Sequence, residues 1–181
     1  MPVYISLLRG INVGGHAKVP MKQLQAMLEA LGFEQVRTLI QSGNAVFEAR
    51  KLSTSAVSRK IEDKIVAEFG FAASVVTRTP EEWANAIDAN PFVKESKTAP
   101  NKLHIAFLAE EPELDATKKL DANRSATERV RCSGREVYLY YRDGMGQAKL
   151  TGAVIERILG VKATARNWNT VTKLYEMASA T

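Results

Sequence analysis

The chain has 181 residues, of which 45% are hydrophobic and 25% are charged, and its net charge is +5 at pH 7. This composition excludes a disordered chain, and the sequence has no run of about 18 apolar residues that could span a membrane. The single cysteine, Cys132, excludes an internal disulfide and is typical of the reducing cytosol, so we expect a cytoplasmic protein.

The first half of the chain switches between strand and helix patterns. Alternating apolar residues indicate strands, and apolar spacings of three and four indicate helices. These patterns predict strands over 3–8, 35–40, 44–49 and 72–77, a helix over 20–31, and a helix from Ser53, Thr54 or Ser55 to Gly70. The resulting order, β-α-β-β-α-β, is that of the split ferredoxin-like unit.

The second half repeats this order. A short helix begins at Pro80, and the polar segment Asn90–Asn101 is expected to be a linker. The patterns then predict strands over 103–108, 128–132, 136–142 and 162–166, and helices over 112–120, 150–159 and 168–178. We therefore expect an α+β fold with two tandem ferredoxin-like halves, 1–79 and 102–181, joined by 80–101, the second half ending in a helix. The duplication is inferred from the order of elements, because the halves share no clear residue-level repeat.

The connection Arg9–Val19 joins the first strand to the first helix and contains Asn12, Gly14, Gly15 and Lys18. Glycines and the amino end of a helix allow an anion to approach the backbone, and the arginine and lysine can add charged hydrogen bonds. The spacing matches neither glycine pattern of nucleotide-binding loops. The alternative is that the glycines serve only the turn and that Asn12 satisfies backbone groups.

A second polar segment is the hairpin that contains Gln41, Ser42 and Asn44. Turn chemistry alone can explain these residues, and a role in ligand binding is the alternative.

A third polar segment precedes the last helix and contains Arg166, Asn167, Trp168 and Asn169. In one interpretation, Asn169 or Thr170 caps the helix and Trp168 anchors it to the core. In the other, Arg166 meets a carboxylate or phosphate and Trp168 stacks on a ring.

Aromatic residues alternate along the strand 136–142. If Val137 and Leu139 face the helices, then Tyr138, Tyr140 and Arg142 lie on the open face of the sheet, where RNA-recognition domains of this topology stack bases. The match is incomplete, because the neighbouring strand offers no aromatic residue to that face.

Metal and nucleophile patterns are absent from the sequence. Two histidines and one cysteine, far apart, give no metal-ligand spacing, and no acidic pair has metal-binding spacing. No nucleophile elbow is present, and Cys132 lies in an alternating strand as a packing residue. We expect no metal and no cofactor.

Several short sequence motifs between about Val3 and Met177 resemble those of a known family. They are Leu7-Leu8-Arg9-Gly10-Ile11-Asn12-Val13-Gly14-Gly15, Val19-Pro20-Met21, Leu31-Gly32-Phe33, Val36-Arg37-Thr38, Ile40-Gln41-Ser42-Gly43-Asn44, Asn90-Pro91-Phe92 and Arg166-Asn167-Trp168-Asn169-Thr170-Val171. In combination they resemble the domain-of-unknown-function 1697 family. The resemblance implies a bacterial cytoplasmic protein with two ferredoxin-like halves, and it implies no activity.

Three functional hypotheses follow. The first is a protein that binds a small anion, such as a nucleotide or other phosphate, in a polar pocket between its halves, lined by the three polar segments. This set is rich in amides and arginine and poor in groups that titrate near neutral pH, which suits recognition better than acid–base catalysis. The second is an enzyme that uses the same pocket with His16 as the proton carrier. The third is an RNA or single-stranded nucleic-acid binder that uses Tyr138, Tyr140 and Arg142.

Overall fold

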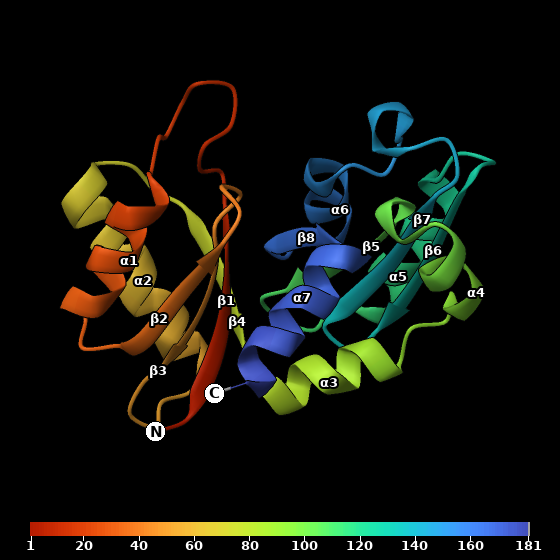
Figure 1. Ribbon diagram of the computed structural model, residues 1–181. Helices are drawn as coiled ribbons and strands as arrows, with labels where there is room; N and C mark the ends of the chain where they lie inside the picture. Colours follow the sequence, from red (N-terminus) through yellow and green to blue (C-terminus); the bar gives the residue numbers. More distant parts are fainter. Residues whose placement is uncertain (181) are drawn as a thin grey trace. The chain divides into compact units, whose positions relative to one another are not determined.

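The computed structural model describes residues 1–180. The described residues form two compact units, unit 1 with residues 1–84 and 174–180, and unit 2 with residues 85–173. Each unit contains one four-stranded antiparallel sheet (Figure 1). No helix within residues 1–180 is long and apolar enough to cross a membrane.

Unit 1 has the predicted order β-α-β-β-α-β. Its elements are β1 Val3–Arg9, α1 Met21–Ala30, β2 Glu34–Leu39, β3 Asn44–Glu48, α2 Thr54–Phe69 and β4 Ser74–Arg78. The strands lie in the order β2-β3-β1-β4, and every neighbouring pair is antiparallel. The helices α1 and α2 lie on one face of this sheet (Figure 1). The predicted ferredoxin-like arrangement is confirmed for this unit.

The core of unit 1 lies between this sheet and its two helices. Tyr4 and Leu8 of β1 pack in it with buried residues of α1 and α2, and the ring of Phe33 stacks on that of Phe47 with centroids 4.5 Å apart. The apolar stripes are those predicted from helical spacing: Leu24, Met27 and Leu28 in α1, and Val57, Ile61 and Ile65 in α2. Since alternate strand residues point to opposite faces, Arg9 lies on the face turned away from these helices.

Unit 2 repeats this arrangement after two short helices. Its elements are α3 Pro80–Asp88, which begins in unit 1, α4 Val93–Thr98, the 3₁₀ helix η1 Pro100–Lys102, β5 Leu103–Leu108, α5 Leu114–Asn123, β6 Glu128–Ser133, β7 Glu136–Tyr141, the 3₁₀ helix η2 Met145–Gln147, α6 Gly152–Leu159, β8 Ala163–Asn167 and α7 Trp168–Ser179, which ends in unit 1. The strand order β6-β7-β5-β8 is equivalent to that of unit 1. The expectation of two ferredoxin-like halves is therefore confirmed.

The core of unit 2 has the same construction. Val137, Leu139 and Tyr141 of β7 face α5 and α6 and pack with Leu120 and Ile155 of those helices. The buried carboxylate of Glu128 accepts hydrogen bonds from the backbone N–H groups of Lys149 and Leu150, which fixes the segment before α6.

The segment 90–101, expected to be a linker, contains α4 and η1 instead. Phe92 is 2% exposed, and its N–H donates to the side chain of Asn90 at 2.9 Å, so a single buried ring fixes this otherwise polar stretch. One aromatic residue gives no periodic signal, which is why the sequence did not indicate a helix here.

Candidate functional site

The loop between β1 and α1 folds into a miniature hairpin. The His16 N–H donates to the Val13 carbonyl at 3.0 Å, and the Asn12 N–H donates to the Ala17 carbonyl at 3.0 Å. Gly14 and Gly15, the two central residues, have φ values of 58° and 76°, which is the geometry of a type I′ turn. The turn therefore accounts for both glycines, and their exposed backbone leaves this tip open to solvent.

The side chain of Asn12 holds the base of this hairpin. Its Nδ2 donates to the carbonyls of Val19 at 2.9 Å and Gln41 at 2.8 Å, and its Oδ1 accepts from the Val19 N–H at 2.8 Å. Both amide hydrogens are thus committed to backbone carbonyls. Asn12 acts as a clamp that fixes the loop against the β2–β3 hairpin.

The β2–β3 hairpin is held by a second asparagine. Asn44 is fully buried, and its Nδ2 donates to the Leu39 carbonyl at 2.8 Å and to Oγ of Ser42 at 3.1 Å. Gly43 has a φ of 86°, and a Cβ on it would lie 2.7 Å from Cδ1 of Ile11. The predicted turn chemistry explains Ser42 and Asn44.

Ile40 is a strained residue at the tip of the same hairpin. It is 54% exposed and has a φ of 49°, a left-handed conformation that a β-branched residue rarely adopts. Such strain persists where the surroundings over-determine the backbone, and it is concentrated at functional sites. This strain could not be predicted, because an isoleucine is an unexpected residue for this conformation.

The clamped loop and hairpin line an open hollow of about 340 Å³. Its lining residues are Asn12, Gly15, Lys18, Val19, Pro20 and Gln41. Within residues 1–180 the exposed side chains of Lys18 and Gln41 make no hydrogen bond or ion pair. These two side chains, one cationic and one an amide, are the groups that the hollow offers to a ligand.

The hollow lies at the amino end of α1. This helix begins after Pro20, and its first turn holds no acidic residue. In the part of the chain that the structure describes, no side chain caps it. The first N–H groups of a helix have no partner within the helix, and they carry the positive end of its dipole. Together with Lys18 they make the hollow electropositive.

The structure therefore brings Asn12, Gly15 and Gln41 of the predicted ligand set to one hollow, with Lys18. Arg9 ends β1 opposite Ser74 on the other face of the sheet. Gly14, Ser42 and Asn44 belong to the turns beside the hollow and do not line it.

The predicted residues of unit 2 have structural contacts. Arg166 lies on β8 opposite Ile105, its guanidinium donates to the Ala165 carbonyl at 2.8 Å, and burial lowers its pKa to about 10. The Oδ1 of Asn167 accepts from the Thr170 N–H at 3.0 Å, so Asn167 caps α7. The sequence suggested Asn169 or Thr170 as the cap of this helix, and that prediction is wrong.

The first residues of α7 complete this segment. Trp168 is half-buried and Asn169 is exposed, and the carbonyls of both accept from the Thr172 hydroxyl at 3.0 and 3.1 Å. These bonds belong to the first turn of the helix.

The aromatic strand β7 offers little ring surface to solvent. Tyr138 is 1% exposed, and its hydroxyl donates to the Ala86 carbonyl at 2.5 Å. Tyr140 is half-buried, and Arg142 is exposed. A base-stacking platform needs open rings, and this strand presents none that is fully exposed.

Residues 1–180 contain no group of three or more His, Cys, Asp or Glu side chains that could hold a metal ion. Burial raises the pKa of the Cys132 thiol to about 11, so this cysteine is protonated at neutral pH and chemically inert.

Comparison with known proteins places the chain in a group without an assigned activity. A family model described as "Protein of unknown function (DUF1697)" matches residues 1–138. No curated protein matches the chain. The structure of a conserved bacterial protein from Streptococcus pneumoniae is similar, with a TM-score of 0.72 and 22% sequence identity over 98% of both chains. At that identity the likeness concerns the fold.

Proposed function

Since this chain belongs to the DUF1697 family, we propose its function from geometry: it binds a small phosphate- or carboxylate-bearing ligand in the hollow at the amino end of α1. The observation that carries the proposal is the exposed ammonium group of Lys18 beside an uncapped helix end, in a hollow of about 340 Å³. That volume is within the range of small-molecule sites. The single free cysteine supports a reducing, cytoplasmic setting for this binding, and the family resemblance implies a bacterial one.

The hydrogen bonds that fix the walls of the hollow favour a ligand-binding role over that of a simple connecting loop. Asn12 fixes Val19 and Gln41 at once with three hydrogen bonds of 2.8–2.9 Å. The strained backbone of Ile40 directly precedes Gln41. A preorganised wall lowers the entropy that binding must offset.

A titration with defined anions tests this proposal. We expect inorganic phosphate and adenosine monophosphate to cause saturable shifts in the amide NMR signals of Gly15, Met21 and Lys22. Lys18→Gln should weaken the binding about fivefold or more, because a charged hydrogen bond is replaced by a neutral one. Lys60→Gln, which removes an exposed lysine lining a different hollow of unit 1, is the matched control and should leave the affinity unchanged.

Shifts that do not saturate, or an affinity that Lys18→Gln leaves intact, would contradict the proposal. Native mass spectrometry of freshly purified protein would identify a ligand that is retained through purification. Comparing wild type with Lys18→Gln in that measurement distinguishes a ligand of this hollow from one bound elsewhere.

A further inference from the structure

The outer edge of β6 is an open strand edge in unit 2. β6 is the first strand in the order β6-β7-β5-β8, and the two residues Gly134 and Arg135 join it to β7, with Ser133 opposite Glu136. The pair that closes a two-residue hairpin is hydrogen-bonded, and bonded pairs alternate along an antiparallel ladder. The N–H and C=O groups of Arg129 and Arg131 therefore point toward β7, and those of Val130 and Cys132 point outward.

These outward groups have no hydrogen-bond partner within residues 1–180. At the start of the strand the outward carbonyl of Glu128 does have a partner, because Nη1 of Arg124 donates to it at 3.1 Å. The edge is thus closed at Glu128 and open along Val130 and Cys132. An open edge of this kind is a template for one more strand.

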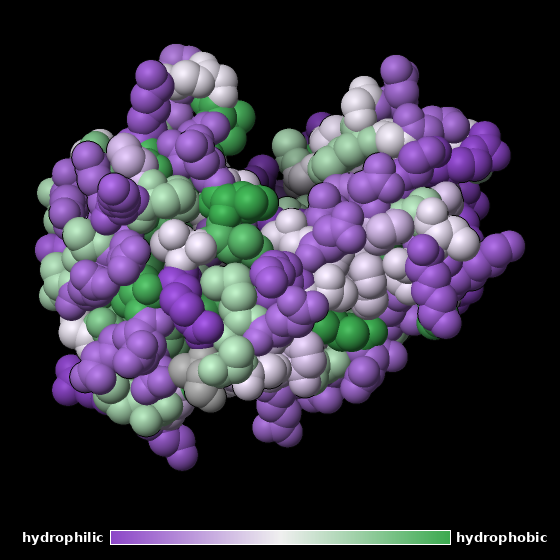
Figure 2. Space-filling model, viewed as in Figure 1, coloured by the Kyte–Doolittle hydropathy of each residue, from purple (hydrophilic) through white to green (hydrophobic). Residues whose placement is uncertain are grey.

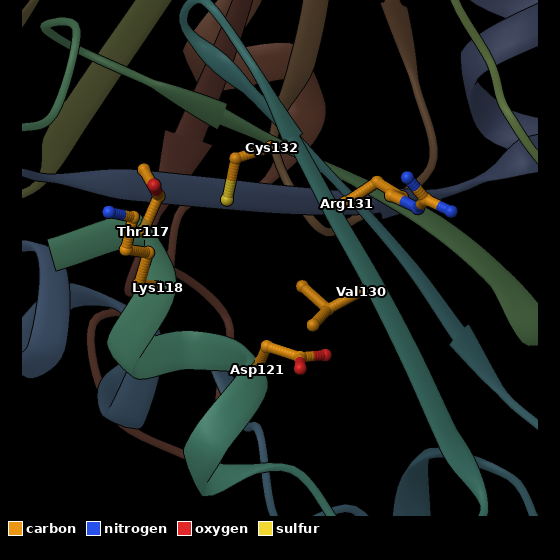
Figure 3. A pocket seen from close by; sticks show the side chains of 6 residues that line it. All are labelled: Thr117, Lys118, Asp121, Val130, Arg131 and Cys132. Atoms are coloured by element: carbon orange, nitrogen blue, oxygen red, sulfur yellow. The ribbon is translucent and has the colours of Figure 1, made fainter. Parts of the chain in front are cut away.

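A hollow of about 420 Å³ lies beside this open edge. It is lined by Thr117, Lys118 and Asp121 of α5 and by Val130, Arg131 and Cys132 of β6. Figure 3 shows the side chains of Val130 and Cys132 on the side of α5, and that of Arg131 on the opposite side of the strand. An added strand lies about 4.8 Å from its neighbour, and its side chains need room on both faces of the sheet. The hollow supplies that room on the α5 face.

The surroundings of the edge are basic. Lys118 and Arg129 have side chains that are 72% and 53% exposed, and Arg131 is exposed as well. The ammonium group of Lys118 lies 4.0 Å from the carboxylate of Asp115, whose side chain is 92% exposed, so this surface ion pair is weak and leaves Lys118 accessible. Arg129 lies over the ring of Phe92 at 4.6 Å and pairs with Glu95 at 2.5 Å, so its position is fixed. In Figure 2 the surface over α4, α5 and β6 is a mixture of hydrophilic residues and residues of intermediate hydropathy. Asp121 is the one acidic side chain that lines the hollow.

We propose that the edge of β6 binds an extended acidic peptide segment of a partner protein as a fifth strand of the unit 2 sheet. The outward N–H and C=O groups of Val130 and Cys132 would bind its backbone, and Lys118 and Arg131 would bind its carboxylates. This mode of recognition takes its affinity from main-chain bonds and its specificity from alternate side chains. A second copy of this chain is a poor occupant, because it would bring the same arginines together, and like charges across a strand pair repel.

The test uses two labelled octapeptides built from glutamate pairs and valine pairs in turn, which puts carboxylates on both faces of an added strand. One is unmodified and the other is N-methylated at every residue. The modified peptide keeps the charge and loses the N–H groups needed for strand pairing. We expect the unmodified peptide to bind the full chain and to slow hydrogen exchange at the Val130 and Cys132 amides, while exchange at the Arg129 and Arg131 amides stays unchanged. The methylated peptide and a lysine–valine octapeptide should not bind.

Two variants separate the backbone contribution from the charge contribution. Val130→Pro removes an outward N–H without touching the ladder to β7, a substitution that edge strands tolerate, and it should abolish binding. The double variant Lys118→Glu with Arg131→Glu should weaken binding about tenfold, since two attractive charge pairs become repulsive. Lys162→Glu, an exposed charge reversal just before the opposite edge strand β8, is the control and should leave binding unchanged. Circular dichroism checks that each variant is folded.

Three results would overturn the proposal. Equal binding of the methylated peptide would show attraction by charge without strand addition. Unchanged exchange at Val130 and Cys132 in the bound state would place the peptide elsewhere. A concentration-dependent dimer that Val130→Pro abolishes would make a second copy of the chain the occupant.

Discussion

At the scale of single residues, Asn12 is the residue on which the candidate site depends. One amide side chain bonds two segments of the chain that are 29 residues apart, through the Gln41 carbonyl at 2.8 Å, and it also bonds both backbone groups of Val19. Its own backbone has a φ of 54°, a conformation that asparagine tolerates better than most residues. Asparagine thus meets a conformational and a hydrogen-bonding requirement at once.

The first prediction separates these two requirements. Asn12→Gly removes the side-chain bonds and keeps the left-handed backbone, so we expect the free energy of unfolding to fall by about 1–3 kcal/mol. Asn12→Ala removes both, and it should lower the free energy by about 1 kcal/mol more. Urea denaturation of the three proteins measures both differences. Variants within experimental error of wild type would show that the clamp adds no stability.

Replacing Ile40 should raise the free energy of unfolding, in contrast to replacing Asn12, because the Ile40 backbone is strained and its side chain is exposed. Ile40→Asn places a residue that adopts positive φ at lower cost, and it should raise the free energy of unfolding by about 1 kcal/mol. Val13→Asn is the control, since Val13 is also β-branched, is 66% exposed, and has no positive φ. A rise in both variants would point to side-chain hydrophobicity instead of strain.

His104 is a buried histidine whose Nδ1 has no hydrogen-bond partner among residues 1–180. It contacts the Tyr141 ring edge-on at 5.2 Å, and burial lowers its pKa below the ordinary value of 6.5, against a smaller opposing effect from a backbone hydrogen bond with Lys102. The unfolded chain therefore binds a proton at a pH where the folded protein does not. Stability from this residue is present above pH 6.5 and is lost as the pH falls toward the folded pKa.

The third prediction follows from this loss of stability at low pH. We expect His104→Phe to keep the ring contact with Tyr141 and to flatten the fall in unfolding free energy between about pH 7 and about pH 5. Chemical denaturation across this range, with the exposed His16→Phe variant as the control for loss of a histidine, measures the effect. An unchanged pH profile in His104→Phe would assign the acid sensitivity to other groups.

At the scale of elements, Glu128 links β6 to the segment that leads into α6. Its buried carboxylate accepts from the N–H of Leu150 at 3.0 Å, and the hydroxyl of Tyr141 donates to the Leu150 carbonyl at 2.7 Å. The N–H group of Leu150 is thus bonded to a side chain of β6, and its carbonyl is bonded to a side chain of β7. The glycines of 144–146 turn the chain before this point, and the fixed segment positions Thr151 to cap α6 through the Val154 N–H.

The fourth prediction tests this link. Glu128→Gln places an amide N–H₂ beside backbone N–H donors, and we expect the free energy of unfolding to fall by about 1–3 kcal/mol. Hydrogen exchange at Lys149 and Leu150 should accelerate more than exchange in the central strand β5. Glu111→Gln, at an exposed position before α5, is the control and should change neither measurement.

The elements were largely predictable from the sequence because their signals are local. Gly70 ends α2 as predicted, and Ser53, one of the three candidates for its start, caps it. Both signals are local, since the Ser53 side chain accepts from the Ala56 N–H and Gly70 supplies the left-handed end. The site was less predictable. For Asn12 and Asn44 the sequence left open a role in ligand binding or in hydrogen bonding to the backbone. In the structure both amides donate to backbone carbonyls, and Asn12 also lines the hollow. The decisive bond of Asn12, to Gln41, is visible only after β2 and β3 have folded beside the loop.

The β6 edge was missed for a related reason. Arg129 and Arg131 are ordinary charges in the sequence, and their spacing of two residues is compatible with any exposed strand. Their significance arises from the strand order, which leaves β6 at the edge beside a hollow. An edge position depends on pairing with distant strands, so local patterns could not indicate it.

At the scale of the whole molecule, each unit has a core of its own. The apolar cluster around Leu28 draws on residues between Tyr4 and Val75, and the cluster around Leu139 draws on residues between Ala106 and Ala163. The chain also returns to unit 1 at Leu174, inside α7. The end of that helix is tied to unit 1 by Arg37, whose guanidinium donates to the Met177 carbonyl at 2.7 Å.

The last prediction uses this division. Leu28→Ala and Leu139→Ala each leave a cavity in one core, which costs about 2–5 kcal/mol. Because local opening follows the stability of the cooperative unit that contains an amide, Leu28→Ala should accelerate hydrogen exchange in β1 and β3, and Leu139→Ala in β5 and β7. The amides of 174–179 should respond to Leu28→Ala along with β2, since Leu174 and Ala178 are buried and Met177 is bonded to Arg37. Amides of 170–173 should respond to Leu139→Ala. If every amide of α7 followed one variant alone, the helix would be a cooperative part of that unit, and the division at Leu174 would carry no energetic meaning.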